Sequence, residues 1–295
     1  MSSRLPVLKT WKLFIGGQFP RSESGRSLHV HDAGGEVIGE ICHASRKDLR
    51  DAVEAARAAR DAWAGRTAYN RGQILYRMAE MLEARREEFT ALLRQSARLP
   101  AAKAAAAARR EVDASIDRLV CFAGWADKFA QVLGCQNPVA GPYYNFTVPD
   151  PTGVIVAFTP QEPALLGFVT LFAPALTSGN TVVLIAPERA AVCAAVYGEV
   201  CATSDVPAGV LNVLTGRHAE LAEPAASHRD IDAIVAAGVT AEIAATLRGG
   251  AAENVKRVTI LTHKGEEWYD ESACESPWTI EPFVEMKTIW HPAAP

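Results

Sequence analysis

Short runs of consecutive apolar residues alternate with helix-like segments through the second half of the chain. The apolar runs occupy residues 153–158, 181–185, 210–214, 231–235 and 257–261. Between them, residues 165–176, 190–202 and 241–247 are predicted to be helices. Strands that are apolar on both faces are typical of a parallel sheet covered by helices on both sides. We therefore predict an α/β fold with a doubly wound parallel sheet across residues 153–265.

Residues 1–133 are expected to form short strands and helices that pack on this domain. The turn-rich stretch 12–42 is typical of short strands. Ser45 is a candidate helix N-cap, with Asp48 three residues later. An apolar stripe that begins at Leu75 and ends at Leu93 predicts one further helix, which stops before the proline at position 100.

The last two regions are expected to be extended. Proline and glycine punctuate residues 134–152, which predicts a hairpin or linker rather than a helix. Residues 266–295 are predicted to be a short linker followed by a C-terminal strand. One face of that strand would carry Val284, Met286 and Trp290.

The composition excludes several classes of partner. The 295 residues include 30 Lys and Arg against 34 Asp and Glu, a formal charge of −4, and no basic patch for nucleic acid. No apolar run approaches the roughly 20 residues that span a bilayer, and the first ten residues lack the pattern of a secretory signal. The six cysteines form no C-x-x-C pair, so we expect reduced thiols and a cytoplasmic location.

Five segments, taken together, resemble the aldehyde dehydrogenase family. They lie in order at residues 13–17, 122–128, 173–184, 206–216 and 254–259. The resemblance implies an NAD-binding-like domain and a small oligomerisation flap, made from the early strands, the hairpin after residue 134 and the C-terminal strand. It also implies a catalytic domain between the segments at 254–265 and 281–290, and that domain is absent from the sequence.

The catalytic positions that the resemblance implies have changed. An asparagine that would hold the developing oxyanion is replaced within Pro160-Gln-Glu-Pro, where Gln161 keeps a donor and Glu162 adds a negative charge. The general-base position holds Leu261, which cannot accept a proton. We interpret the nearby His263 as a surface or loop histidine rather than a replacement base.

The ribose-binding position is only partly retained. A lysine of the family is replaced by Ile185, whereas the glutamate that follows it survives as Glu188. Glu188 would either bind ribose hydroxyls or act as an ordinary carboxylate favoured by a helix dipole.

The turn that would bind a pyrophosphate is also weakened. Gly238 is retained, but Val239 replaces a serine and Ile243 replaces a glycine. Glu242, in the first turn of the helix, would repel a phosphate, while Thr240 would supply one hydroxyl contact. We expect no cofactor at this site, or weak NAD(P) binding at most.

The remaining reactive side chains do not form a catalytic set. Cys274 lies among carboxylates, which raise the pKa of a thiol and disfavour the nucleophilic thiolate. His29 and His31 alternate on one strand face, but no third metal ligand follows from the spacing. We therefore predict neither a catalytic residue nor a metal site.

These features favour a non-catalytic subunit, inactive alone. The family pairs subunits through the flap strand, so the resemblance implies β-augmentation of a full-length catalytic aldehyde dehydrogenase through the strand that begins at Phe283 and ends at Trp290, or self-association. An alternative is an oxidoreductase component that binds NAD(P) through Glu188 and Gly238 and contributes to a shared active site. A third is a scaffold that folds alone as a monomer.

Overall fold

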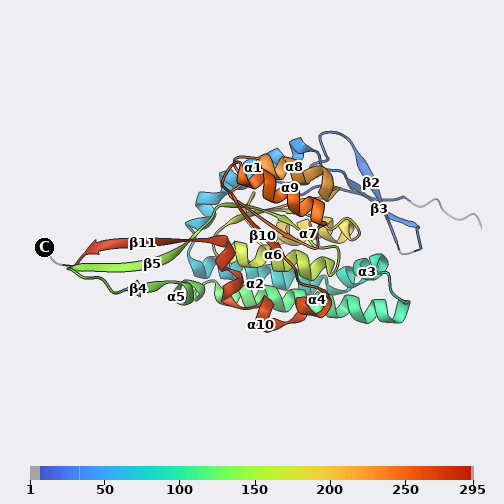
Figure 1. Cartoon of the computed structure of the whole chain (residues 1–295). Helices are drawn as coiled ribbons and strands as arrows, with labels where there is room; N and C mark the ends of the chain where they lie inside the picture. Colours follow the sequence, from blue (N-terminus) through green and yellow to red (C-terminus); the bar gives the residue numbers. More distant parts are fainter. Residues whose placement is uncertain (1–6, 33, 294–295) are drawn as a thin grey trace, which may run out of the picture.

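The computed structural model describes residues 7–32 and 34–293, and its centre is a five-stranded parallel sheet (Figure 1). The strands, in chain order, are β6 (Val154–Phe158), β7 (Thr181–Ile185), β8 (Leu211–Leu214), β9 (Ala233–Ala237) and β10 (Arg257–Leu261). Their spatial order is β10-β9-β6-β7-β8. The first strand, β6, therefore lies in the middle of the sheet, and the later strands are added on both sides of it. The predicted doubly wound sheet is confirmed, and its topological switch point lies between β6 and β9.

Helices cover both faces of this sheet (Figure 1). One face packs on α1 (Arg46–Ala64), α8 (His218–Ser227) and α9 (Ala241–Ala252). The other face packs on α6 (Ala164–Thr177) and α7 (Ala191–Thr203). Around these two helices lie α2 (Ala68–Ala84), α3 (Arg86–Ser96) and α4 (Ala101–Trp125). Within β6, Val156 belongs to one core and its neighbours Ile155 and Ala157 to the other. Because successive side chains alternate between faces, a strand buried on both faces must be apolar throughout.

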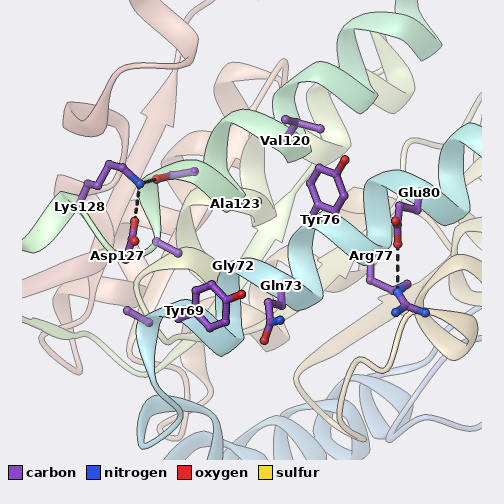
Figure 2. A pocket seen from close by; sticks show the side chains of 13 residues that line it. Tyr69, Gly72, Gln73, Tyr76, Arg77, Glu80, Val120, Ala123, Asp127 and Lys128 are labelled. Carbon is purple, nitrogen blue, oxygen red and sulfur yellow. Dashed lines mark hydrogen bonds and ion pairs between the residues drawn. The ribbon is translucent and has the colours of Figure 1, made fainter.

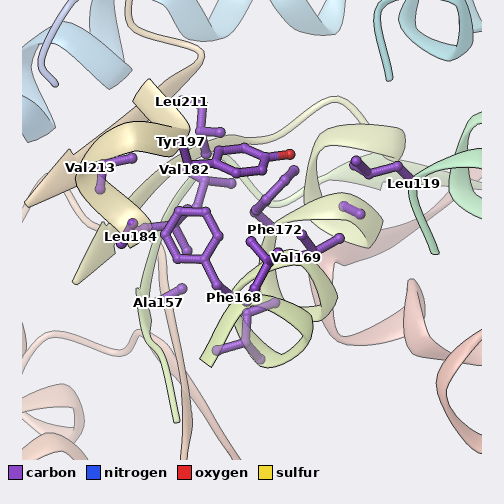
Figure 3. Packing of buried hydrophobic residues seen from close by; sticks show 14 of the residues in the cluster. Leu119, Ala157, Phe168, Val169, Phe172, Val182, Leu184, Tyr197, Leu211 and Val213 are labelled. Atoms are coloured by element: carbon purple, nitrogen blue, oxygen red, sulfur yellow. The ribbon is translucent and has the colours of Figure 1, made fainter. Parts of the chain in front are cut away.

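Three aromatic rings form the centre of the larger core (Figure 3). The Tyr197 ring of α7 lies 5.1 Å from the ring of Phe168 and 5.6 Å from that of Phe172, both on α6. Every residue of α6 is buried. A helix that is apolar on all sides is stable only when surrounded by protein, so α6 requires the cover that α2, α4 and α7 provide.

The predicted cap of α1 is confirmed. The Ser45 hydroxyl accepts hydrogen bonds from the N–H groups of Lys47 and Asp48, and the Asp48 carboxylate accepts the Ser45 N–H at 2.7 Å. This reciprocal capping box satisfies N–H groups that the helix itself leaves free. The same carboxylate accepts the Ser22 hydroxyl, which joins the start of α1 to the N-terminal segment.

Two predictions of local structure are wrong, and one helix was missed. The stripe from Leu75 to Leu93 spans two helices, which meet at Arg85, where the backbone leaves helical geometry. Strand β9 lies two residues later than expected. Helix α8 was not predicted; it contains Pro224, a residue that argues against a helix interior.

The early strands also differ from what the resemblance implied. β1 (Thr10–Trp11), β2 (Ser27–His31) and β3 (Val37–Cys42) form a separate three-stranded sheet and do not join the flap. This sheet packs on α7, and a Cβ at Gly39 would lie 3.1 Å from the side chain of Val192. The early strands therefore extend the α/β body.

A third sheet projects from that body (Figure 1). It consists of β4 (Cys135–Asn137), β5 (Tyr143–Pro151) and β11 (Val284–Pro292), in the order β11-β5-β4. The short helix α5 (Phe129–Leu133) directly precedes β4 in the chain. β11 is antiparallel to β5 and pairs with it along its whole length. We call this sheet the flap. The hairpin of residues 134–152 and the C-terminal strand thus lie in one sheet.

The segment between β10 and β11, residues 262–283, packs against the body. It contains α10 (Glu271–Cys274) and three short 3₁₀ turns. Arg118 of α4 donates to the Glu275 carboxylate at 3.1 Å and to the carbonyl of Trp268 at 3.0 Å. The indole of Trp125 donates to the Glu275 carbonyl at 2.9 Å. We call residues 262–283 the connecting segment. Across the described residues, no helix has the length and apolar character needed to cross a membrane.

Candidate functional site

A cavity of about 520 Å³ lies where β6, β9 and β10 end. Its wall includes Gln161 and Glu162 after β6, Gly238 after β9 and His263 after β10, together with Arg189 from the loop after β7. The carboxyl ends of parallel strands at a switch point are where doubly wound sheets bind ligands. Four of the positions that the sequence singled out therefore meet here. We call this space the switch-point cavity.

Glu111 of α4 also lines this cavity, and the sequence interpretation missed it. Its carboxylate accepts the N–H groups of Leu165 and Leu166, at 2.6 and 3.3 Å, in the first turn of α6. Burial raises the pKa of this carboxyl to about 7, although the two N–H donors act in the opposite direction. The sequence did contain an indication that Glu111 is buried, because it lies at helical spacing after Ala104 and Ala108, which are both buried.

The side chains after β6 bind the neighbouring loop. Glu162 forms a 3.0 Å ion pair with the guanidinium of Arg189, and the Gln161 side-chain oxygen accepts the Arg189 N–H at 3.1 Å. The extra negative charge expected from Glu162 is thus balanced by a cation. With its oxygen directed to the Arg189 backbone, Gln161 connects two loops.

Gly238 has a structural requirement independent of any ligand. Its φ is +62°, and an added Cβ would lie 3.1 Å from the Cβ of Pro160. Thr240 is the N-cap of α9, and its hydroxyl accepts the Ile243 N–H at 3.2 Å. One of the N–H groups that would attract a phosphate is therefore already bonded, and Glu242 lies in the same turn.

Glu188 does not line the switch-point cavity. It is exposed, and its carboxylate accepts the N–H of His218 at 3.0 Å, at the start of α8. Of the two alternatives left open by the sequence, this contact matches the carboxylate favoured by a helix dipole. The helix concerned is α8, which the sequence interpretation did not include.

Leu261 and His263 lie at the end of the edge strand β10. Leu261 is half-buried and apolar, so no carboxylate occupies that position. The His263 ring packs edge-on against the ring of Trp268, with centroids 5.2 Å apart. This contact lies within the connecting segment and links its first residues to the 3₁₀ turn that contains Trp268.

Cys274 is buried in the connecting segment, where its thiol donates to the carbonyl of Glu267 at 3.4 Å. The pKa of this thiol is raised, as predicted, but burial is the main cause and the nearby Asp270 and Glu275 contribute less. Among the residues that the structure describes, no cysteine lines the switch-point cavity.

The histidine pair on β2 does not develop into a metal site. The rings of His29 and His31 are 6.5 Å apart and edge-to-face. Within residues 7–32 and 34–293, no group of three or more His, Cys, Asp or Glu side chains is arranged to hold a metal ion.

A second, more open groove of about 580 Å³ runs between α2 and α4 (Figure 2). Tyr69, Tyr76 and Val120 are exposed along it. Gly72 forms part of its floor, because a Cβ there would lie 2.7 Å from the carbonyl oxygen of Ala123. None of the candidate site residues from the sequence lines this groove, although part of the matching segment 122–128 does.

Known proteins match this fold and sequence. Residues 19–263 match the family model described as the aldehyde dehydrogenase family. Retinal dehydrogenase 2 of Gallus gallus is 35% identical over 258 residues, which are 86% of this chain and 48% of that protein. The mitochondrial aldehyde dehydrogenase family 2 member B4 of Arabidopsis thaliana is 33% identical over 84% of this chain and 46% of its own length.

Solved structures agree. The NAD+ complex of an aldehyde dehydrogenase from Bacillus cereus has a TM-score of 0.79 at 27% identity, over 85% of this chain and 50% of that chain. An NAD-dependent aldehyde dehydrogenase from Sinorhizobium meliloti has a TM-score of 0.80 at 27% identity, over 88% of this chain and 51% of that chain. The chain spans about half the length of the relatives it matches. Over the part that it shares with them, this chain belongs to the aldehyde dehydrogenase family.

Proposed function

We propose that this chain is a non-catalytic subunit that binds a catalytic aldehyde dehydrogenase by adding β11 to a sheet of that partner. The observation that carries the proposal is the position of β11 at the edge of the flap, with β5 on one side only among the described residues. An edge strand presents unpaired N–H and C=O groups along its length, and another strand satisfies them.

The register identifies the backbone groups that are free. Thr152 N–H donates to the Phe283 carbonyl, which makes the pair of Val284 and Pro151 a non-hydrogen-bonded one. Since bonded and non-bonded pairs alternate in an antiparallel ladder, Met286 is also in a non-bonded pair. Its N–H and C=O groups, like those of every second residue of β11, point away from β5.

The side chains of the flap offer an apolar surface beside that edge. Met286 is 47% exposed and Trp290 is 59% exposed. The ring of Tyr143, itself 47% exposed, packs edge-on against Trp290 at 5.8 Å. Exposed aromatic and methionine side chains are enriched in protein interfaces, so this surface supports a protein partner.

The substituted catalytic positions support the non-catalytic part of the proposal. Leu261 offers no base, and the raised pKa of Cys274 disfavours a thiolate. The connecting segment packs on α4 through Arg118. It brings His263, Lys264 and Glu266 to the switch-point cavity, but no cysteine.

The test is capture of a partner by single-residue variants. Tagged protein expressed in its native host should co-purify with a full-length aldehyde dehydrogenase, identified by mass spectrometry. Met286→Pro should abolish capture because proline removes an outward N–H. Met286→Ala, which keeps that N–H, should retain it. Circular dichroism and size-exclusion chromatography would check that both variants fold. Recovery of the chain only as a monomer or a homomer would refute the proposed partner.

A second candidate function is an NAD(P)-binding component of a shared active site. The switch-point cavity and the similarity to an enzyme solved with NAD+ favour it. The residues at the start of α9 do not fit a pyrophosphate, because Thr240 takes the Ile243 N–H and Glu242 adds negative charge. The ribose position fits no better, since Glu188 is bonded to α8.

We therefore expect calorimetric titration with NAD or NADP to give no binding tighter than about 1 mM. Glu242→Gln removes the like charge and tests whether repulsion is the reason. If the unsubstituted protein binds either dinucleotide with micromolar affinity, the cofactor-binding component becomes the better description of the chain.

A further inference from the structure

A third cavity, of about 380 Å³, separates the connecting segment from the sheet and α6. One wall consists of Leu171 and Pro174 of α6 with Leu261 of β10. The opposite wall contains Trp278 and Phe283 of the connecting segment. We call it the segment cavity. Its volume is within the range of about 300–1,000 Å³ that is typical of small-molecule sites.

The segment cavity has no formal charge on its wall. Its described lining residues include no Asp, Glu, Lys or Arg, and their polar side-chain groups are hydroxyls, the Cys274 thiol, the His263 ring and the Trp278 indole N–H. The switch-point cavity is different, because Glu111, Glu162 and Arg189 line it. An ionised ligand in the segment cavity would lose its hydration without gaining a counter-charge, which is strongly unfavourable.

This cavity depends on a part of the chain that lies outside the family match. The match ends at residue 263, whereas Cys274, Trp278 and Phe283 all come later. On the other wall, Leu261 holds the position where the resemblance implies the general base. A leucine there makes that wall apolar, so the change that removes the base also contributes to the cavity.

The outer wall is held in place by bonds that do not face the cavity. Arg118 joins Glu275 and Trp268 to α4, and Trp268 is 1% exposed. The Cys274 thiol donates within the segment to Glu267. A wall fixed in this way requires little ordering when a ligand binds, which favours affinity. Trp278 lines the cavity and is 58% exposed, so its indole lies at the opening to solvent.

We propose that the segment cavity binds an uncharged, mainly apolar small molecule, with one hydrogen-bonding group for Thr259 or His263 and a planar body beside Trp278. One water takes about 30 Å³ of liquid volume, so the space suits on the order of a dozen non-hydrogen atoms. The aromatic rim favours a flat ring, because aromatic pairs contribute beyond the area they bury.

The first test uses three probes of one shape. Calorimetry at pH 7 would compare neutral 1-indanone with cationic 1-aminoindane and anionic indane-1-carboxylate. We expect 1-indanone to bind with a dissociation constant below 1 mM and each charged probe to bind at least tenfold more weakly. Absence of heat for 1-indanone up to its solubility, or equal affinity for a charged probe, would overturn the proposal.

The second test locates the binding. Thr259→Met adds volume to the wall, whereas Thr262→Met places the same side chain at an exposed position that does not line the cavity. We expect Thr259→Met to weaken 1-indanone binding at least tenfold and Thr262→Met to leave it unchanged. Trp278→Ala changes an exposed residue and should weaken binding severalfold even if Thr259→Met does not fold. Unchanged affinity in both Thr259→Met and Trp278→Ala would exclude this cavity as the site.

Discussion

Replacing Arg118 with methionine is expected to lower the free energy of unfolding by about 3 kcal/mol. The Arg118 side chain is 2% exposed and bonds to Glu275, to the Trp268 carbonyl and to the hydroxyl of Thr170. Methionine would fill much of the space but leave the buried Trp268 carbonyl without a donor. Because Glu275 is 21% exposed, water would compensate for part of its lost ion pair.

Urea denaturation would measure this change, with Arg110→Met as the matched control. Arg110 also lies on α4 and pairs with Glu266 of the connecting segment, but both side chains are largely exposed. Solvent-exposed ion pairs contribute little to stability, so the control should remain close to the unsubstituted protein. Equal losses in the two variants would show that burial of Arg118 is not what secures the segment.

Substituting Glu111 with glutamine is expected to remove a pH dependence and to stabilise the protein above neutral pH. The folded-state pKa of Glu111 is about 7, above its ordinary value of 4.5. The stability that this group contributes is therefore complete below pH 4.5 and is lost as the pH rises to about 7, since only the unfolded chain ionises in that window. Each pKa unit corresponds to about 1.4 kcal/mol, so the loss is about 3–4 kcal/mol.

Glutamine keeps an oxygen that can accept the N–H groups of Leu165 and Leu166 but cannot ionise. We expect Glu111→Gln to be more stable than the unsubstituted protein by about 3–4 kcal/mol at pH 8, with the difference shrinking toward pH 4.5. Urea midpoints across that range would measure it. Glu83→Gln, at an exposed position of α2, is the control. Parallel pH profiles for Glu111→Gln and the unsubstituted protein would show that Glu111 does not titrate in this range.

Features that depend on neighbouring residues in the chain could be predicted closely. β7 and β10 occupy the predicted residues, because short, mainly apolar runs bounded by turn residues favour strands. β7 is buried throughout, whereas the edge strand β10 is only partly buried. Ser45 and Asp48 cap α1 as expected, since both partners lie within one turn. The hairpin and C-terminal strand also followed from local pattern, although their pairing is between distant residues.

Features that depend on distant residues could not be predicted in the same way. Glu188 was kept as a candidate helix-terminus carboxylate, but its bond to His218 lies at α8, a helix that was not predicted because it contains Pro224. The raised pKa of Cys274 was predicted with the wrong main cause, because sequence neighbours indicate charge and not burial. Arg85, where α2 and α3 meet, carried no recognised breaking signal.

The order of apolar runs along the chain was enough to predict the α/β class, because hydrophobic periodicity and turn residues act over a few positions. The family was indicated by the resemblance of five short segments. The three-dimensional packing decided which of those residues share a cavity. Glu111 meets the start of α6, and Trp278 meets Leu261, only after α4 and the connecting segment pack on the sheet. Desolvation and shape depend on all surrounding atoms, and those atoms come from residues far apart in the sequence.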